Sequence, residues 1–526
     1  MKRRDFLQNT IPAAVLPSLV DNFSIRVLGD NPVMAALLNT YVETDRVLVI
    51  IQLNGGNDGL NMVIPLDQYS KYYNARSNIA IAENKVLSLS GTNAVGLHPS
   101  MTGLQTLYNN GKLRLVQAVG YPNPNFSHFR ATDIWMSAAD SDEQLTSGWG
   151  GRYLNDQYPN YPVGYPNTTV PDPLGIQIGS SASLAFQGPS VNMGISISSA
   201  TNFYNLINGI QDPAPATRAG DALQYVRLVA KQSNQYSTRI SAAAAAVPTQ
   251  GTYPTNNTLA DQLKIVARLI KGGLKTRVYM VSMGGFDTHS AQTNTDTSTG
   301  NHATLMQRLS DAVKAFQDDL QAMGIEDRVL GMTFSEFGRR IKSNASTGTD
   351  HGAAAPLFVF GTKVNPGISG VNPTIPTTAT VNDNIPMQFD FRSVYATILQ
   401  NWFCVDSTTL ETIMLQNFQQ LGLCASGNCS TTTDVNDIRN AGITLISNYP
   451  NPFTSSTTIS FTTKGGHTLV QVMDALGRVI QTPVDRVYAS GKYQVTFEGY
   501  ALPAGVYYMR FQNGMTQQVK PMLKVR

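Results

Sequence analysis

The stretch of residues 276–361 most constrains the fold of this chain, because it alternates between two hydrophobic patterns. Short β-branched apolar runs at 277–282, 329–334 and 356–360 are typical of buried strands, whereas residues 303–323 repeat apolar positions at helical spacing. Strands that alternate with helices indicate an α/β fold with a mainly parallel sheet. We therefore expect a parallel-rich sheet with helices on both faces.

Acidic residues and histidines follow these predicted strands. Asp287 and His289 come after the first run, Glu336 comes directly after the second, and Asp350 and His351 lie before the third. Loops at the carboxyl ends of parallel strands meet at one edge of a sheet, so we expect these side chains to surround one crevice. Mixtures of carboxylates and imidazoles suit Zn²⁺ or Mn²⁺, with Ca²⁺ or Mg²⁺ where oxygens dominate. The sequence therefore predicts a metal site.

A further loop follows the continuous apolar run of residues 46–53, which is typical of a strand buried on both faces. Asn54 and Asp58 offer oxygen ligands there, and the neighbouring glycines allow the backbone to approach a ligand closely. The alternative is an ordinary turn after a strand, for which Asn, Asp and Gly are the usual residues. We include Asn54 and Asp58 among the candidate metal ligands.

Ser127 lies where the predicted strand at 113–119 leads into a helix. A serine at such a turn serves either as a nucleophile, with helix N–H groups nearby, or simply as the helix cap. Arg130 follows three residues later and offers a guanidinium for the oxygens of an anionic substrate. Ser127 and Arg130 are the candidate catalytic residues.

Length and composition indicate the number of domains and the kind of partner. The 526 residues exceed one ordinary domain, and a net charge of +3 with 14% charged residues does not indicate a nucleic-acid partner. Residues 141–215 are rich in Gly, Pro, Asn and Tyr, so we expect a loop-rich insertion that covers the crevice and contributes to substrate specificity.

The amino-terminal residues 1–30 predict an export signal. Lys2, Arg3 and Arg4 precede a short apolar segment that Pro12 and Pro17 interrupt, and this segment is too short to span a bilayer. The Arg-Arg-Asp-Phe-Leu run resembles a twin-arginine signal, which implies transit through the periplasm. The alternative is a basic amphipathic start of a cytosolic chain.

The carboxyl-terminal part changes character after a polar linker at 430–442. Residues 443–526 show short alternating strand runs at 457–461, 468–473, 493–497, 506–511 and 518–523, which predict a small β-sandwich. The three cysteines, Cys404, Cys424 and Cys429, lie before this part. In an oxidising compartment we expect a disulfide, either between Cys424 and Cys429 or from Cys404 to one of them.

This tail carries the motifs NYPNPF at 448–453 and GVYY at 505–508, followed by a basic end. In combination they resemble the sorting domain of the type IX secretion system. The resemblance implies contact with that secretion machinery in a Bacteroidetes-type bacterium, followed by secretion or attachment at the cell surface. A carbohydrate-binding or matrix-binding β module is the alternative.

The predicted central domain, residues 40–429, carries the motifs NGGNDGLN, PNFSHFRATDIW, GGFDTH, TFSEFGRR and GTDHG. Together they resemble the bacterial family called domain of unknown function 1501, which is similar in fold to the alkaline phosphatase and sulfatase superfamily. By position, the resemblance implies Asp58 or Asn54 as the first metal ligand and Ser127 as the nucleophile. It also implies metal ligation by Asp287 and His289, by Glu336, and finally by His351.

Two departures from the superfamily pattern favour one metal ion over two. Asp287 and His289 stand only two residues apart, and Phe337 occupies a position where a ligand is expected. We therefore predict a secreted metal-dependent hydrolase of phosphate or sulfate esters that acts on small molecules or glycans. The alternative is a non-catalytic exported or cell-surface binding protein on a degenerate phosphatase-like scaffold.

Overall fold

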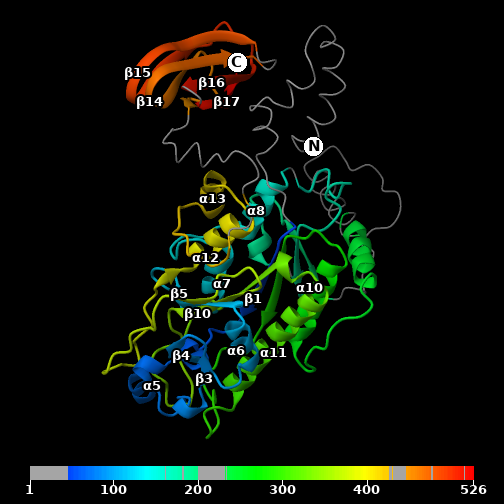
Figure 1. Cartoon of the computed structure of the whole chain (residues 1–526), viewed down its shortest axis with the longest axis vertical. Helices are drawn as coiled ribbons and strands as arrows, with labels where there is room; N and C mark the ends of the chain where they lie inside the picture. Colours follow the sequence, from blue (N-terminus) through cyan, green and yellow to red (C-terminus); the bar gives the residue numbers. More distant parts are fainter. Residues whose placement is uncertain are drawn as a thin grey trace, which may run out of the picture. The chain divides into compact units, whose positions relative to one another are not determined.

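The computed structural model describes residues 45–159, 161–180, 183–198, 232, 234–425, 429, 446–474, 478–513 and 516–525. They form two units, one within Glu43–Gly427 and one whose described residues lie within Asn428–Arg526, and each is described by itself (Figure 1). The predicted export signal and linker lie outside the described residues. Within the described part of the chain, no helix has the length and apolar character needed to cross a membrane.

The first unit is built on a central sheet in the order β11-β5-β10-β9-β1-β8-β6-β7, with β12 paired to β5. Its strands are β1 (Val47–Leu53), β5 (Leu113–Gly120), β6 (Gly175–Ile178), β7 (Gly194–Ile197), β8 (Val278–Met283), β9 (Val329–Phe334), β10 (Ala355–Phe360), β11 (Gly367–Ser369) and β12 (Phe389–Asp390). β1 pairs in parallel with β8 on one side and β9 on the other. The predicted mainly parallel sheet is confirmed.

One strand differs from the predicted arrangement. β10 runs antiparallel to both of its neighbours, β9 and β5. The amino-terminal end of β10 therefore lies at the same edge of the sheet as the carboxyl-terminal ends of β1, β5, β8 and β9. The loop that carries Asp350 and His351 reaches the crevice because it precedes an antiparallel strand, and not because it follows a parallel one.

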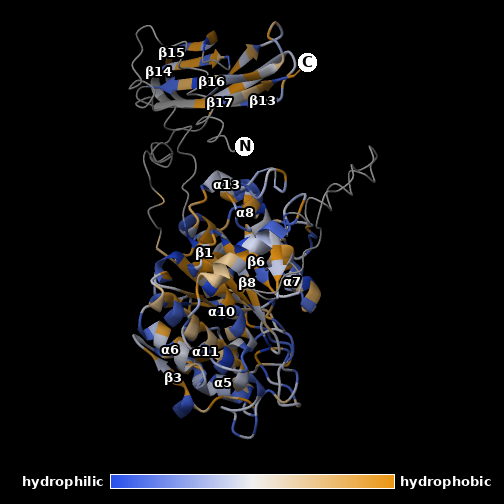
Figure 2. Cartoon of the chain, turned by 90° about the vertical axis from the view of Figure 1, so that its right-hand side faces the viewer, coloured by the Kyte–Doolittle hydropathy of each residue, from blue (hydrophilic) through white to orange (hydrophobic). Residues whose placement is uncertain are grey.

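Helices cover both faces of this sheet, as predicted (Figures 1 and 2). The helices are α6 (Thr102–Asn109), α10 (Thr258–Lys271) and α11 (Asn301–Ala322) on one face, and α7 (His128–Ser137), α8 (Trp149–Gln157), α12 (Phe391–Thr397), its π-helical continuation η6 (Ile398–Trp402) and α13 (Ser407–Met414) on the other. Alternate residues of β1 point to opposite faces. Val49 and Ile51 join the α10–α11 core, whereas Leu48 and Ile50 join the core on the α7 side.

The segment between β1 and β5 contains a second, three-stranded sheet. Its elements are α4 (Gly59–Met62), β2 (Val63–Pro65), α5 (Tyr69–Ala75), β3 (Leu87–Leu89) and β4 (Thr92–Leu97), with the strand order β2-β4-β3. The short helix α4 opens directly after Asp58, whose φ and ψ are extended as in a helix N-cap. The four residues of this helix are too few to show a helical period in the sequence.

The predicted insertion at 141–215 contains two short strand-like runs, at 174–178 and 191–197. These runs contain β6 and β7, which extend the central sheet beyond β8 in parallel, and α8 packs on the same sheet. That this segment covers the crevice stays a prediction. Residues 199–215 lie outside the described part of the chain.

The second unit is an antiparallel sheet in the order β13-β14-β16-β17, with β15 paired to β14. Its strands are β13 (Ser447–Tyr449), β14 (Ser456–Met473), β15 (Val479–Glu498), β16 (Gly505–Asn513) and β17 (Thr516–Lys524). The predicted strands at 457–461 and 468–473 are the two ends of the single strand β14. Ile459 and Val470, from opposite ends of β14, share one apolar core, so this long strand curves around its own core.

Cys404 and Cys429 are disulfide-bonded, and Cys424 is a buried free thiol. This arrangement is one of the alternatives left open by the sequence. Burial raises the pKa of the Cys424 thiol to about 12, so the thiol stays protonated and unreactive at neutral pH.

Two buried histidines give the first unit a predicted sensitivity to acid. Burial lowers the pKa of His98 to about 3 and that of His302 to about 4. The unfolded chain protonates both imidazoles near pH 6.5, whereas the folded chain does not, so their contribution makes the free energy of unfolding fall between about pH 6.5 and pH 4. Urea unfolding at a series of pH values should show a shallower fall for His98→Gln/His302→Gln. His467→Gln, at an exposed histidine, is the control, and an unchanged slope in the double variant would contradict the assignment.

Candidate metal centre

Four side chains converge at the edge of the sheet where β1, β5, β8 and β9 end. His128 is the first residue of α7, Asp287 and His289 follow β8, and His351 precedes β10. The Nε2 atoms of His289 and His351 lie 2.9 Å apart, and they lie 3.1 and 3.2 Å from Oδ1 of Asp287. Nε2 of His128 lies 3.5 Å from Oδ2 of the same carboxylate.

The other ring nitrogen of His351 and of His128 is bound to a fixed oxygen. Nδ1 of His351 lies 2.8 Å from the carbonyl oxygen of Phe126, which only accepts hydrogen bonds, so this nitrogen carries the proton. Nδ1 of His128 lies 2.9 Å from Oε1 of Glu336, which also accepts the N–H of Gly55. In the neutral form, both imidazoles therefore present an Nε2 lone pair to Asp287.

The outer ring nitrogen of His289 is also bound to an oxygen, here that of an exposed carboxylate. Its Nδ1 lies 3.2 Å from Oδ1 of Asp350, and Asn344 donates to the same carboxylate oxygen. The hydrogen bond from Asn344 and the neighbouring His289 lower the pKa of Asp350, so the carboxylate is ionised and accepts the Nδ1–H of His289. Nε2 of this third imidazole is thereby also left as an acceptor.

This arrangement of acceptors fits a divalent metal ion. The Nε2 atoms of three imidazoles face the carboxylate of Asp287. The two bare Nε2 atoms of His289 and His351, 2.9 Å apart, repel unless a cation or a proton lies between them. Ligand atoms of His128, Asp287 and His351 all lie within 4.8 Å of one another. Imidazoles whose outer nitrogen is fixed by a carboxylate or carbonyl oxygen are the usual arrangement at metal sites.

The electrostatics of the centre favour these charge states. Partial burial alone would raise the pKa of Asp287, but the hydrogen bond and the charge of Arg339 lower it to about 2. Burial lowers the pKa of His351, and its hydrogen bond to the carbonyl oxygen of Phe126 offsets this only in part. A neutral imidazole beside an ionised carboxylate is the form that binds a metal.

Arg339 fixes the position of Asp287. Its side chain is 0% exposed, and it donates to Asp287 Oδ1 at 2.7 Å. The same guanidinium donates to the carbonyl oxygens of Gly55, Gly56, Phe286 and Thr349. One side chain thus joins the loops after β1 and β8 to the loop before β10.

Two glycines allow these loops to approach so closely. A Cβ on Gly55 would lie 2.3 Å from the backbone nitrogen of Asp287, and one on Gly56 would lie 2.3 Å from the ring of Phe337. Both glycines also have positive φ, at 123° and 77°. The Phe337 ring packs on the imidazoles of His128 and His351, with centroids 4.9 and 4.5 Å away, and forms an apolar wall behind them.

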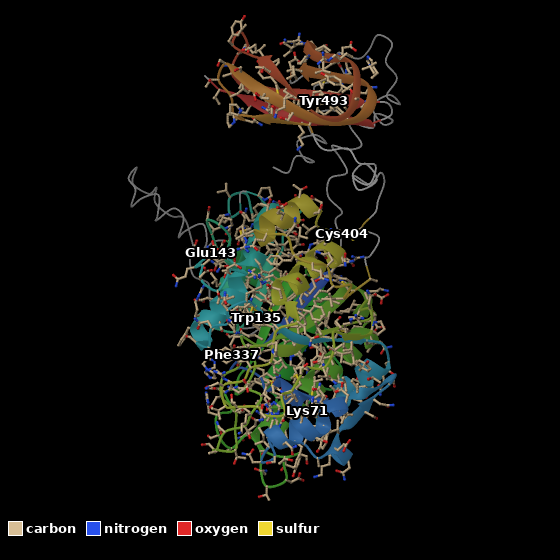
Figure 3. All side chains as sticks on the ribbon, turned by 90° about the vertical axis from the view of Figure 1, so that its left-hand side faces the viewer. Lys71, Trp135, Glu143, Phe337, Cys404 and Tyr493 are labelled. Atoms are coloured by element: carbon tan, nitrogen blue, oxygen red, sulfur yellow. The ribbon has the colours of Figure 1, made fainter. Side chains whose placement is uncertain are left out.

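An open cleft of about 420 Å³ lies beside the centre. Its lining residues come from the loops after β1 and β8, from the first turns of α7, and from the end of β9: Asn54, Gly55, His128, Phe129, Thr132, Asp133, Gly284, Gly285, Asp287 and Glu336. This cleft is the crevice that the sequence predicted at the edge of the sheet. Figure 3 shows this side of the unit, with Phe337 and Trp135 labelled.

The structure brings some predicted ligands into this group and places others around it. Asp287, His289 and His351 are at its centre. Glu336 and Asp350 lie one hydrogen bond further out, where each orients an imidazole. They do so because each carboxylate faces an Nδ1 atom, and not the point where the Nε2 atoms meet.

Two other predicted ligands lie outside this group. Asp58 is 1% exposed and is bound by Arg76 at 2.7 Å and by Gln292 at 2.6 Å, so its oxygens are occupied within the core. Burial opposes ionisation of Asp58, but the charge of Arg76 more than compensates and lowers its pKa. Asn54 lines the cleft without contacting the imidazoles. Asp58 and Asn54 are therefore not part of the group.

The two predicted catalytic residues, Arg130 and Ser127, lie in different surroundings. Arg130 donates to the carbonyl oxygens of Asp140, Ser141 and Glu143, so it stabilises that loop and does not line the cleft. Ser127 is exposed at the start of α7, and its hydroxyl makes neither a capping bond nor any other hydrogen bond to the described part of the chain.

His128 is the member of the centre that the sequence analysis did not select. It directly follows Ser127, the residue of that turn that the sequence predicts as the nucleophile. The signal was its place at the first helical position after a strand that ends at the crevice. Its role depends on the contact with Glu336, which is 208 residues away and is visible only in the fold.

Comparisons with known proteins match both units. The family described as "Protein of unknown function (DUF1501)" matches residues 45–414, and the "Secretion system C-terminal sorting domain" matches residues 447–524. No curated protein matches the chain.

Solved structures give distant likenesses. A protein in the alkaline phosphatase superfamily from Vibrio parahaemolyticus is 10% identical over 92% of this chain and 83% of that chain, with a TM-score of 0.31. The putative sulfatase yidJ from Bacteroides fragilis is 10% identical over 89% and 92%, with a TM-score of 0.32. PorZ, a surface component of the type IX secretion system of Porphyromonas gingivalis, is 15% identical over 20% of this chain and 14% of its own length, with a TM-score of 0.13. Scores this low support no conclusion about activity.

Arg339→Lys should weaken the centre, because a lysine ammonium cannot reach the five acceptors that the guanidinium joins. We expect the free energy of unfolding to fall by about 2–4 kcal/mol and the affinity for a divalent ion to fall about 10–100-fold. Urea unfolding and competition with a metal chelator measure the two effects. Arg308→Lys, on the exposed face of α11, is the matched control. A folded Arg339→Lys protein with undiminished metal affinity would show that Arg339 does not position Asp287.

Proposed function

This chain belongs to the DUF1501 family, and we propose that it is an exported metal-dependent hydrolase of phosphate or sulfate esters carried by small molecules or glycans. The observation that carries the proposal is the convergence of three imidazole Nε2 atoms on the carboxylate of Asp287. The sorting domain at 447–524 indicates export, with secretion or attachment at the cell surface. The basic start of the chain, with its Arg3-Arg4 pair, supports transit through the periplasm on the way to the type IX machinery.

We propose that one ion binds here, held by His128, Asp287, His289 and His351. Three nitrogens and one carboxylate favour Zn²⁺ or Mn²⁺ over Ca²⁺ or Mg²⁺, which prefer oxygen ligands. A bound ion of this kind supplies a Lewis acid for a phosphoryl or sulfuryl oxygen. Asp58 is committed to Arg76, so it offers no ligand for a second ion.

The surrounding residues prepare the site. Glu336, Asp350 and the carbonyl of Phe126 hold the three imidazoles with their Nε2 atoms directed inward. Arg339 holds Asp287 ionised and in place. The ring of Phe337 keeps water from the back of the imidazoles, which strengthens electrostatic interactions at the centre.

Ser127 is the proposed nucleophile. Its hydroxyl is exposed, lacks a hydrogen-bond partner among the described residues, and precedes His128 in the chain. The start of α7 directs free backbone N–H groups toward this turn, which favours an approaching anion. Arg130 has no part in the proposal, because its guanidinium is occupied by backbone carbonyls.

A specific observation favours a second candidate function, that of a non-catalytic exported binding protein. Enzymes that transfer phosphoryl groups surround the non-bridging oxygens with Arg, Lys or metal ions. Within the described residues, the cleft lining contains no Lys or Arg. A single ion at this centre would then bind a ligand without promoting its hydrolysis.

The full chain purified without chelator should contain about one equivalent of Zn²⁺ or Mn²⁺ by elemental mass spectrometry, because the site offers one set of nitrogen ligands. His128→Ala and the double variant His289→Ala/His351→Ala should each lose the ion. The matched control is His467→Ala, at an exposed histidine of the second unit. Loss of the ion from the double variant but not from His128→Ala would remove His128 from the ligand set, and absence of metal from the reconstituted wild type would refute the centre.

Ser127→Ala should lower turnover of a responsive phosphate or sulfate ester at least about 100-fold, because the attacking oxygen is removed. Metal content and the melting temperature should stay at wild-type values, since the hydroxyl makes no contact that stabilises the fold. Ser70→Ala, at an exposed serine of α5, is the control. Wild-type turnover by the metal-loaded variant would exclude Ser127 as nucleophile. A metal-loaded wild type that hydrolyses no ester of the panel would favour the binding protein.

A further inference from the structure

The cleft beside the metal centre has one aromatic wall. Phe129 is 87% exposed although it stands next to the proposed ligand His128. Thr132 and Asp133 follow at i+3 and i+4, so the three side chains lie on one face of α7, and all three line the cleft. An exposed aromatic ring gains stability when a ligand covers it, and here it stands at the entrance to a cleft.

Another part of the lining is backbone. Gly284 and Gly285 follow β8, and Gly55 follows β1. A Cβ on Gly284 would meet no atom within 4 Å, so the space in front of this residue is open. This part of the cleft, the slot, combines an exposed aromatic ring with open glycine backbone, which suits a flat group.

The lining also selects the charge of that group. Asp133, Asp287 and Glu336 contribute carboxylates, and no Lys or Arg lies among the described lining residues. Asp287 and Glu336 are paired within the metal centre, so Asp133 is the carboxylate that repels a negatively charged group in this slot. Three of its polar groups make no hydrogen bond to the described part of the chain: the amide of Asn54, the hydroxyl of Thr132 and the carboxylate of Asp133. These groups offer several acceptors and three donor hydrogens, two on the amide of Asn54 and one on the hydroxyl of Thr132, to a ligand rich in hydroxyls.

We propose that this slot is a subsite for an uncharged sugar ring. The apolar face of the ring lies on Phe129, and its hydroxyls donate to Asp133 and exchange hydrogen bonds with Asn54 and Thr132. An aryl group would leave these polar groups unpaired in the bound state, which costs free energy. The inference deepens the proposed function and rests on it for one point only, namely that the slot holds the neutral glycan part of an ester substrate.

Binding is measured by calorimetry on the metal-loaded full chain, with neutral β-linked hexasaccharides of glucose, mannose, galactose and xylose as probes. At least one should bind saturably. Phe129→Ala should weaken binding at least 10-fold, and Phe129→Tyr should restore it. Gly284→Val should also weaken binding at least 10-fold, because its side chain adds volume to the glycine part of the lining, where a Cβ meets no atom within 4 Å. Tyr500→Ala, at an exposed aromatic residue of the second unit, should bind like the wild type.

Three results would overturn the subsite. They are the absence of binding by every neutral probe, equal binding by Phe129→Ala, and tighter binding of hexagalacturonate than of any neutral hexasaccharide. Because no turnover is needed, the outcome is separate from that of the proposed hydrolase. Saccharide binding without ester hydrolysis would keep the subsite and support the binding protein. Ester hydrolysis with no saccharide binding would keep the hydrolase and remove the subsite.

Discussion

The buried guanidinium of Arg339 is the interaction on which the geometry of the centre depends. A fully buried charge is stable only when it is paired and its donors are satisfied. Arg339 meets both conditions with Asp287 and with carbonyl oxygens from three loops that are distant in sequence. Gln292 adds a second buried link, since it donates to Asp58 and accepts hydroxyl bonds from Thr288 and Thr349. Arg339 and Gln292 therefore fix the two loops that carry His289 and His351.

The local hydrophobic patterns were sufficient to predict the strands β1, β5, β8, β9 and β10 and the helix α11, because each strand is a short apolar run and the helix repeats apolar positions at helical spacing. They were insufficient for the direction of β10, which depends on pairing with two distant strands. The same limit applies to single residues. Asp58 looked like a ligand because Arg76, its buried partner, lies in another element. The sequence does not single out His128, because its partner Glu336 is 208 residues away.

The position of Phe337 bears on how many ions the site accepts. Its ring packs against Gly56 and two imidazoles and is 2% exposed, so it occupies the volume next to the ligand atoms on the inner side. A ligand for a second ion would have to replace that ring. The position of Phe337 therefore supports the proposal of a single ion. The ring also covers one side of the His128 and His351 imidazoles.

The positions of the proposed ligands on the sheet determine the stage of folding at which the metal centre forms. His128 is carried by β5 and Asp287 by β8, and β10, β9 and β1 lie between these two strands. Five strands must be in register before the ligand atoms meet, so a partly assembled sheet holds no site. For the proposed metal centre, it follows that an ion binds only after these strands have assembled. In an exported protein, the compartment in which the sheet is completed would then determine which metal pool supplies the ion.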